Sequence, residues 1–167
     1  MELRLSGVIK ESIVDGPGIR YTVFAQGCPH HCKGCHNPGT HDFGGGFLCS
    51  IDKLVEDMKK NPLLSGVTLS GGEPFCQAEA MCELAKKVRN MGLNIVVFSG
   101  YTFEQLREGS KQNPAWAELL SLSDLLIDGK FDLSQRDLTL KFRGSRNQRI
   151  IKLKDALEQG VAIEAAI

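Results

Sequence analysis

The sequence alternates between β-strand and α-helix patterns along its 167 residues, and this alternation constrains the fold more than any other feature. Residues 50–60, for example, place Ile51, Leu54, Val55 and Met58 at the i, i+3, i+4, i+7 spacing of an amphipathic helix. Strands that alternate with helices predict a parallel sheet with outer helices in an α/β domain. The expected strands are residues 20–27, 66–70, 94–99, 124–128, 149–153 and 161–167, and the other expected helices end near residue 90, begin at residue 102 and span 154–159.

Three unusual segments follow expected strands directly. A cysteine loop comes after residues 20–27, the sequence GGEP occupies 71–74, and FSGY occupies 98–101. In parallel sheets, functional residues collect at the carboxyl ends of the strands, so these three segments should share one edge. Each alone is also explained as a turn that needs glycine. Three at one edge, one of them carrying three cysteines, predict a functional site.

The cysteine loop contains Cys28, Cys32 and Cys35 in a C-x3-C-x2-C pattern, with no fourth cysteine close behind. A 4Fe-4S cluster is normally held by four thiolates, so three would leave one iron open to a substrate. Three thiolates and one imidazole also make a common zinc site. Histidines at positions 30, 31, 36 and 41 are all near, and the spacing alone does not separate the two metals.

The remaining composition narrows the class of protein. Cys49, Cys76 and Cys82 fit no ligand spacing, and we interpret them as small apolar residues. Twenty basic and twenty acidic side chains balance, so neither nucleic acid nor a membrane is an expected partner. The chain starts without an apolar signal core, and a cytoplasmic location with reduced thiols is expected. Residues 1–167 are expected to form one domain.

The GGEP segment suits a small zwitterionic ligand. Gly71 and Gly72 expose backbone N–H and C=O groups without side chains in the way, and Glu73 adds a carboxylate able to fix the strand end. A phosphate-binding loop is the competing interpretation, but no Lys-Ser or Lys-Thr pair follows the glycines.

These sequence motifs together resemble those of a known family. The cysteine motif followed by GGEP is similar to the radical S-adenosylmethionine superfamily. SIVDGPGIRYTVFAQGCPHHCKGCHNP (12–38), LSGGEPF (69–75), LLIDGKF (125–131) and FRGSRNQRII (142–151) resemble, within it, the activating proteins of anaerobic ribonucleotide reductase.

The resemblance implies a 4Fe-4S cluster on Cys28, Cys32 and Cys35, in a cluster loop at 27–38, whose fourth iron chelates S-adenosylmethionine. Reductive cleavage yields a 5′-deoxyadenosyl radical, which takes hydrogen from a glycine of the partner reductase. A flavodoxin-like or ferredoxin-like protein is the implied electron donor. The implied cosubstrate contacts are Gly34 and His36, which flank Cys35, for the adenine end, Gly71 and Gly72 for the amino end, and Ser99, Gly100 and Asp128 for the ribose and carboxylate. Cys35 and Glu73 are also expected among the cofactor-binding residues.

The resemblance also implies an open, partial (β/α) barrel, because 167 residues are too few for a closed eight-stranded barrel of about 250. An open side suits a substrate that is a loop of another protein. Two other functions stay open: activation of a different glycyl-radical enzyme such as pyruvate formate-lyase, and a non-enzymatic zinc or iron–sulfur module. Five cations are either solvated surface residues or, in the last three cases, contacts to a partner or a carboxylate: Arg20, Lys130, Arg143, Arg146 and Arg149.

Overall fold

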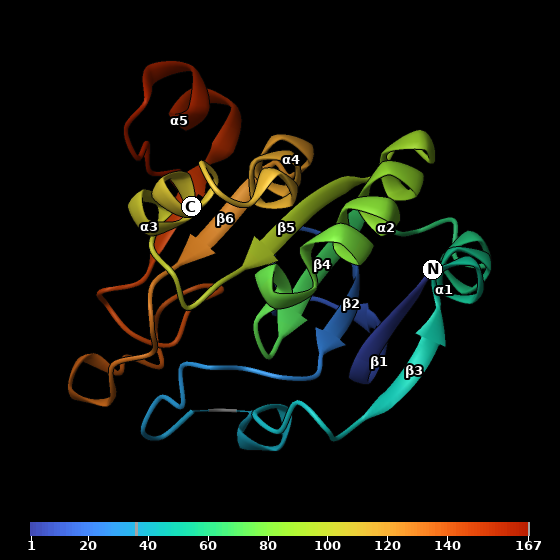
Figure 1. Cartoon of the computed structure of the whole chain (residues 1–167), viewed down its shortest axis with the longest axis horizontal. Helices are drawn as coiled ribbons and strands as arrows, with labels where there is room; N and C mark the ends of the chain where they lie inside the picture. Colours follow the sequence, from blue (N-terminus) through green and yellow to red (C-terminus); the bar gives the residue numbers. More distant parts are fainter. Residues whose placement is uncertain (36, 167) are drawn as a thin grey trace.

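The structure is a computed structural model that describes residues 1–35 and 37–166. Its described strands form one seven-stranded sheet in the order β3-β1-β2-β4-β5-β6-β7 (Figure 1). The strands are β1 (Glu2–Ser12), β2 (Arg20–Ala25), β3 (Phe47–Ser50), β4 (Gly66–Gly71), β5 (Asn94–Phe98), β6 (Leu125–Asp128) and β7 (Arg149–Lys152). The α-helices are α1 (Ile51–Lys59), α2 (Ala78–Asn90), α3 (Phe103–Gly109), α4 (Pro114–Leu122) and α5 (Leu153–Gln159).

The expected α/β class is confirmed, but the expectation of uniformly parallel strands is wrong. β2, β4, β5 and β6 pair in parallel, as predicted. β1 pairs antiparallel with both β2 and β3, and β7 pairs antiparallel with β6. The sheet is open, with β3 and β7 at its edges. The partial barrel is therefore still a prediction, whereas the sheet itself is mixed.

The sequence patterns missed the elements whose burial is weak. β1 was not expected, because only Leu3, Leu5 and Ser12 of its eleven residues are buried. β3 is a four-residue edge strand with no fully buried residue. The expected strand at 161–167 is wrong for its described part, residues 161–166, where Glu164 forms a single bridge to Ile151. These segments lack the burial that gives a strand its sequence period.

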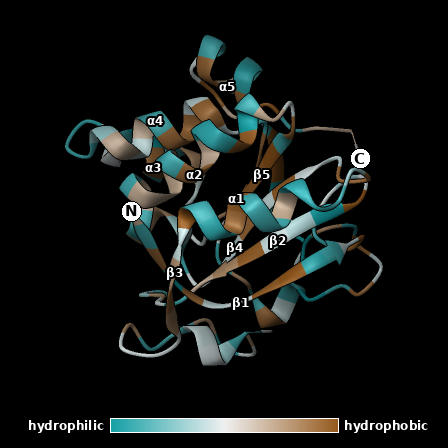
Figure 2. Ribbon diagram, turned by 90° about the vertical axis from the view of Figure 1, so that its right-hand side faces the viewer, coloured by the Kyte–Doolittle hydropathy of each residue, from teal (hydrophilic) through white to brown (hydrophobic). Residues whose placement is uncertain are grey.

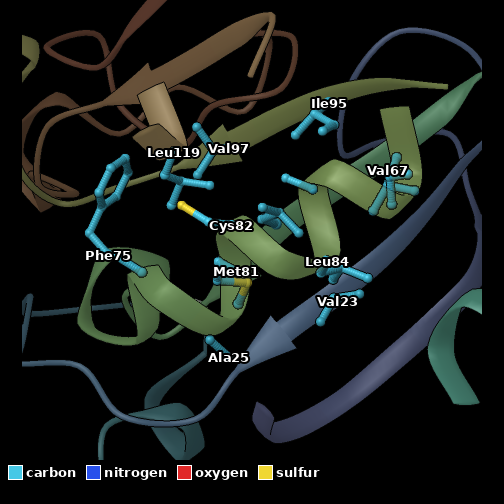
Figure 3. Packing of buried hydrophobic residues seen from close by; sticks show 14 of the residues in the cluster. Val23, Ala25, Val67, Phe75, Met81, Cys82, Leu84, Ile95, Val97 and Leu119 are labelled. Carbon is cyan, nitrogen blue, oxygen red and sulfur yellow. The ribbon is translucent and has the colours of Figure 1, made fainter. Parts of the chain in front are cut away.

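The main core lies between the sheet and the helices. Met81, Leu84 and Val88 of α2 are fully buried, and Figure 3 shows α2 side chains packed over β-strand residues such as Val23 and Val67. Cys82 is 3% exposed within this core, which confirms its interpretation as a small apolar residue. Figure 2 shows both hydrophilic and hydrophobic segments on α1, as expected for a helix with one buried face.

A buried arginine, Arg20, anchors the segment that precedes β2 to the sheet. Arg20 was expected at the surface, but it is fully buried and donates to Thr68 Oγ1 at 2.7 Å, Pro17 O at 2.9 Å and Val67 O at 2.9 Å. Thr68 in turn donates to the carbonyl of Asp15 at 2.9 Å. Burial lowers the pKa of Arg20 to about 10. These bonds hold residues 13–19 beside the strands that build the site.

The parallel strands position the functional loops. In Figure 1 the arrows of β2, β4, β5 and β6 point in the same direction, towards the loops drawn in blue and orange that contain residues 26–46 and 129–148. The expectation that the three unusual segments share one edge is thus confirmed by the topology. No helix of the described residues is long and apolar enough to cross a membrane.

Candidate active site

A cavity of about 730 Å³ lies at the carboxyl ends of the parallel strands. Cys28, Cys32 and Cys35 line it from the loop after β2. The segments after β4 and β5 supply more of the wall through Gly71, Gly72, Ser99 and Gly100. The structure therefore brings most of the predicted site residues around one volume.

Backbone geometry folds the cysteine loop back on itself. Cys28 N donates to His41 O at 3.2 Å, and Cys35 N donates to Cys32 O at 3.2 Å. His31 and Gly34 have positive φ angles of 49° and 75°, which turn the chain between the cysteines. Burial raises the pKa of the Cys28 thiol.

The donor set fits an iron–sulfur cluster. A cubane binds each thiolate to a different iron, so its ligands surround a volume instead of converging on one ion. Cys28, Cys32 and Cys35 all face the same cavity, as such a cluster requires. Among residues 1–35 and 37–166, no three His, Cys, Asp or Glu side chains gather as a site for a single ion.

Close backbone contacts require glycine at Gly71, the last residue of β4, and at Gly72, which follows it. Gly71 has φ +137°, a conformation that side chains disfavour. A Cβ on Gly72 would overlap the carbonyl oxygen of Ala25 and lie 2.7 Å from that of Gly27. Glu73 N also donates to Gly27 O at 2.8 Å. The GGEP segment therefore packs directly on the residue that precedes the cysteine loop.

We expect Gly72→Ala to disturb the cysteine loop as well as the cavity wall. The added methyl group overpacks against Ala25 and Gly27, at a cost of about 1–3 kcal/mol in the free energy of unfolding. Gly39→Ala is the matched control, because nothing lies within 4 Å of its Cβ position, and its effect should stay within about 0.5 kcal/mol. Urea unfolding and iron content after reconstitution measure both variants. Equal losses in the two would contradict the packing explanation.

Other predicted cosubstrate contacts lie behind the cavity wall or elsewhere. Glu73 and Asp128 are buried, at 0% and 1% exposure, and neither is among the lining residues. A Cβ on Gly34 would lie 3.0 Å from Leu133 Cδ1, so Gly34 faces the 129–148 loop. His36 lies outside the described residues.

Asp128 is held in an ion pair. It accepts hydrogen bonds from Arg149 Nη2 at 2.6 Å, Arg149 Nε at 3.1 Å and Phe103 N at 2.8 Å. The bond to Asp128 is the main cause that raises the pKa of Arg149. Arg149 thus has a structural role as the ion-pair partner of Asp128, whereas Arg146 is exposed. Arg143 lines the cavity, and its buried Nε has no hydrogen-bond partner in the structure.

Sequence reasoning missed an apolar part of the wall. Phe24, Phe98 and Phe142 line the cavity, and Phe142 also packs on the small core of Val96, Ile127 and Ile150. At the lining positions Ile13, Val14 and Leu138, the exposed fractions are 74%, 70% and 79%. Large apolar residues outside the strands, such as Ile13, Val14 and Leu138, were the available signal for part of this wall, whereas Phe24 and Phe98 belong to β2 and β5.

Comparisons with known proteins follow the same residues. A family model described as a 4Fe-4S single cluster domain matches residues 14–151. A Vibrio cholerae protein named anaerobic ribonucleoside-triphosphate reductase-activating protein is 36% identical over 146 residues, covering 83% of this chain and 90% of the relative. Proteins of the same name from Haemophilus influenzae and Escherichia coli are 35% and 33% identical, and cover 85% of this chain and 93% and 94% of the relatives.

The chain belongs to the family of anaerobic ribonucleoside-triphosphate reductase-activating proteins. For a member of this activating-protein family, the match to a 4Fe-4S model supports the iron–sulfur interpretation of the cysteine loop over the zinc interpretation. The matched range contains the cysteine loop, the GGEP segment, the strands β2 to β6 and all but the last residue of β7. The resemblance expected from the sequence motifs is thereby confirmed.

Proposed function

We propose that this chain activates an anaerobic ribonucleotide reductase by generating a glycyl radical through reductive cleavage of S-adenosylmethionine at a 4Fe-4S cluster. The observation that carries the proposal is the shared cavity, where three cysteines face the glycine backbone of the GGEP segment. The names of the relatives favour the reductase over pyruvate formate-lyase as the partner.

Cys28, Cys32 and Cys35 would hold the cluster through their thiolates. When bound, the cluster supplies the electron that breaks the sulfonium carbon–sulfur bond of the cosubstrate. The lining positions of Gly71 and Gly72 support a role for their backbone groups at the amino end of the cosubstrate. Ser99 and Gly100, on the adjacent wall, are the proposed contacts to its ribose.

Glu73 and Asp128 have no such position and are proposed to support the wall instead of touching the cosubstrate. Gly34 and His36 remain candidates for the adenine end. Arg143 is a proposed carboxylate contact, because it lines the cavity and a guanidinium matches the geometry of a carboxylate.

The apolar wall would exclude water from the reaction. Phe24, Phe98 and Phe142 surround the volume where a carbon-centred radical would form, and exclusion of water limits side reactions there. The exposed Ile13, Val14 and Leu138 would contact the segment of the reductase that carries the glycine. A flavodoxin-like or ferredoxin-like donor and a cytoplasmic location complete the proposal.

The test uses the anaerobically reconstituted chain, dithionite and S-adenosylmethionine. Alone, the chain should release 5′-deoxyadenosine only slowly. Addition of the anaerobic ribonucleotide reductase should produce a glycyl-radical doublet in the electron paramagnetic resonance spectrum. A reductase with alanine at its radical-site glycine is the control and should give no doublet. Rapid modification of a small molecule without any partner would contradict the proposal, as would a colourless protein that retains zinc alone.

A further inference from the structure

One buried carboxylate joins the three loops of the site. Glu73 Oε1 accepts hydrogen bonds from His30 Nε2 at 2.6 Å, Ser99 Oγ at 2.9 Å and Gly100 N at 2.8 Å. Its Oε2 accepts from Phe75 N at 3.1 Å and from Ser99 Oγ at 3.0 Å. Four groups therefore surround the carboxylate: Ser99 shares its single hydroxyl hydrogen between the two oxygens, and His30 donates in the tautomer that carries hydrogen on Nε2.

The carboxylate acts from behind the cavity wall. The Glu73 side chain is 0% exposed and the His30 side chain is 5% exposed. His30, Gly72, Ser99 and Gly100 all line the cavity, whereas Glu73 does not. Glu73 can therefore influence a bound molecule only through the residues that it holds in place.

The space around His30 is shaped for its ring. A Cβ on Gly100 would overlap the imidazole ring of His30 and would lie 2.6 Å from its Nε2. The ring of Tyr101 meets the imidazole edge-on, with centroids 4.5 Å apart and planes at 77°. Gly100 is thus explained by close packing of His30 on the loop after β5, independently of any contact to ribose.

The position of His30 in the chain determines which segments its hydrogen bond to Glu73 connects. His30 lies between Cys28 and Cys32, whereas Glu73 directly follows the glycines Gly71 and Gly72. The hydrogen bond between them therefore ties the path of the cysteine loop to the GGEP segment from behind the cavity wall.

We propose that His30 and Glu73 are positioning residues that set the placement of the three thiolates relative to the glycine backbone of the GGEP segment. This inference rests on the proposed function, because the two sides that the pair connects are those assigned to the cluster and to the amino end of the cosubstrate. In this role neither residue is a cluster ligand, and Glu73 does not line the cavity. Loss of its hydrogen bond should leave the cluster ligands intact and weaken cosubstrate binding.

Substitutions at His30 separate the hydrogen bond from the packing. His30→Phe keeps a ring against Gly100 and Tyr101 but removes the donor. His30→Gln keeps an N–H donor at the reach of Nε2, and His30→Asn carries the same amide on a shorter side chain. The Gln and Asn variants are a matched pair, which decides the question even if the Phe variant fails to fold.

The measurements are iron content, the dissociation constant of S-adenosylmethionine from its shift of the reduced-cluster electron paramagnetic resonance spectrum, and urea unfolding of the metal-free chain. Supporting residues around metal sites typically change affinity 10–100-fold, so His30→Phe and His30→Asn should bind S-adenosylmethionine about tenfold more weakly or worse. His30→Gln should restore binding to within about threefold of the wild type, and all variants that fold should keep their iron.

Three results would overturn the positioning role. Unchanged binding in His30→Phe or His30→Asn would show that the hydrogen bond is not needed. Equal loss in His30→Gln and His30→Asn would show that the ring itself matters. Loss of iron as complete as in a cysteine variant would assign His30 to cluster assembly. If the wild-type chain itself gives no response to S-adenosylmethionine, the proposed function fails as well, which distinguishes the two ideas.

Discussion

Replacement of Cys28, Cys32 or Cys35 by alanine is expected to abolish S-adenosylmethionine cleavage. Each variant removes one of the three thiolates that face the cavity, which leaves two irons of a cubane without a protein ligand. Iron and sulfide content and 5′-deoxyadenosine release after anaerobic reconstitution measure the effect. The expected loss is complete in each case, because the other three cysteines do not line the cavity.

The other three cysteines are matched controls for this experiment. Cys82 is buried in the core, Cys49 is half-buried on β3, and Cys76 is exposed in the short helix Pro74–Gln77. None of the three lines the cavity. Alanine at these positions should preserve iron content and cleavage. A control variant that lost iron as completely as Cys28→Ala would refute the ligand assignment.

The second large effect is expected from Arg149→Leu. This substitution leaves the carboxylate of Asp128 buried without its ion-pair partner, and such losses typically cost about 3–5 kcal/mol in the free energy of unfolding. The additional pair with Glu104 contributes little, because the Glu104 side chain is 59% exposed. Urea unfolding of the metal-free chain measures the change.

Two further variants test this explanation. Arg146→Leu, in the same motif FRGSRNQRII, removes an exposed arginine and should lower the free energy of unfolding by no more than about 0.5 kcal/mol. Asp128→Asn combined with Arg149→Leu should recover part of the lost stability, because the unpaired charge is gone while Phe103 N still finds an acceptor. If Arg149→Leu were as mild as Arg146→Leu, the explanation from a buried, unpaired carboxylate would be wrong.

The sequence was sufficient for the α/β class, for the common edge of the three loops and for the cysteines. The helical spacing in residues 50–60 indicates burial on one face, and the mainly apolar run at 94–98 indicates burial on both faces. Local periodicity in the sequence reflects such burial. β1 was missed because few of its residues are buried, and β7 was expected as a strand but not as an antiparallel one, since the direction of a strand depends on its partner. Residues 161–166 were misjudged as a strand, because they form only a single bridge, at Glu164.

The roles of individual polar residues were decided only by the tertiary structure. GGEP and FSGY indicated Glu73, Ser99 and Gly100 as contacts to a ligand, but no local pattern shows that His30 reaches Glu73 across 43 positions. Arg20 and Arg149 read as surface cations, but long-range partners bury Arg20 fully and hold the partly exposed Arg149 against the buried Asp128. A charged side chain is buried only where distant groups satisfy its hydrogen bonds, so its place is determined by the packed fold and not by its neighbours in the chain.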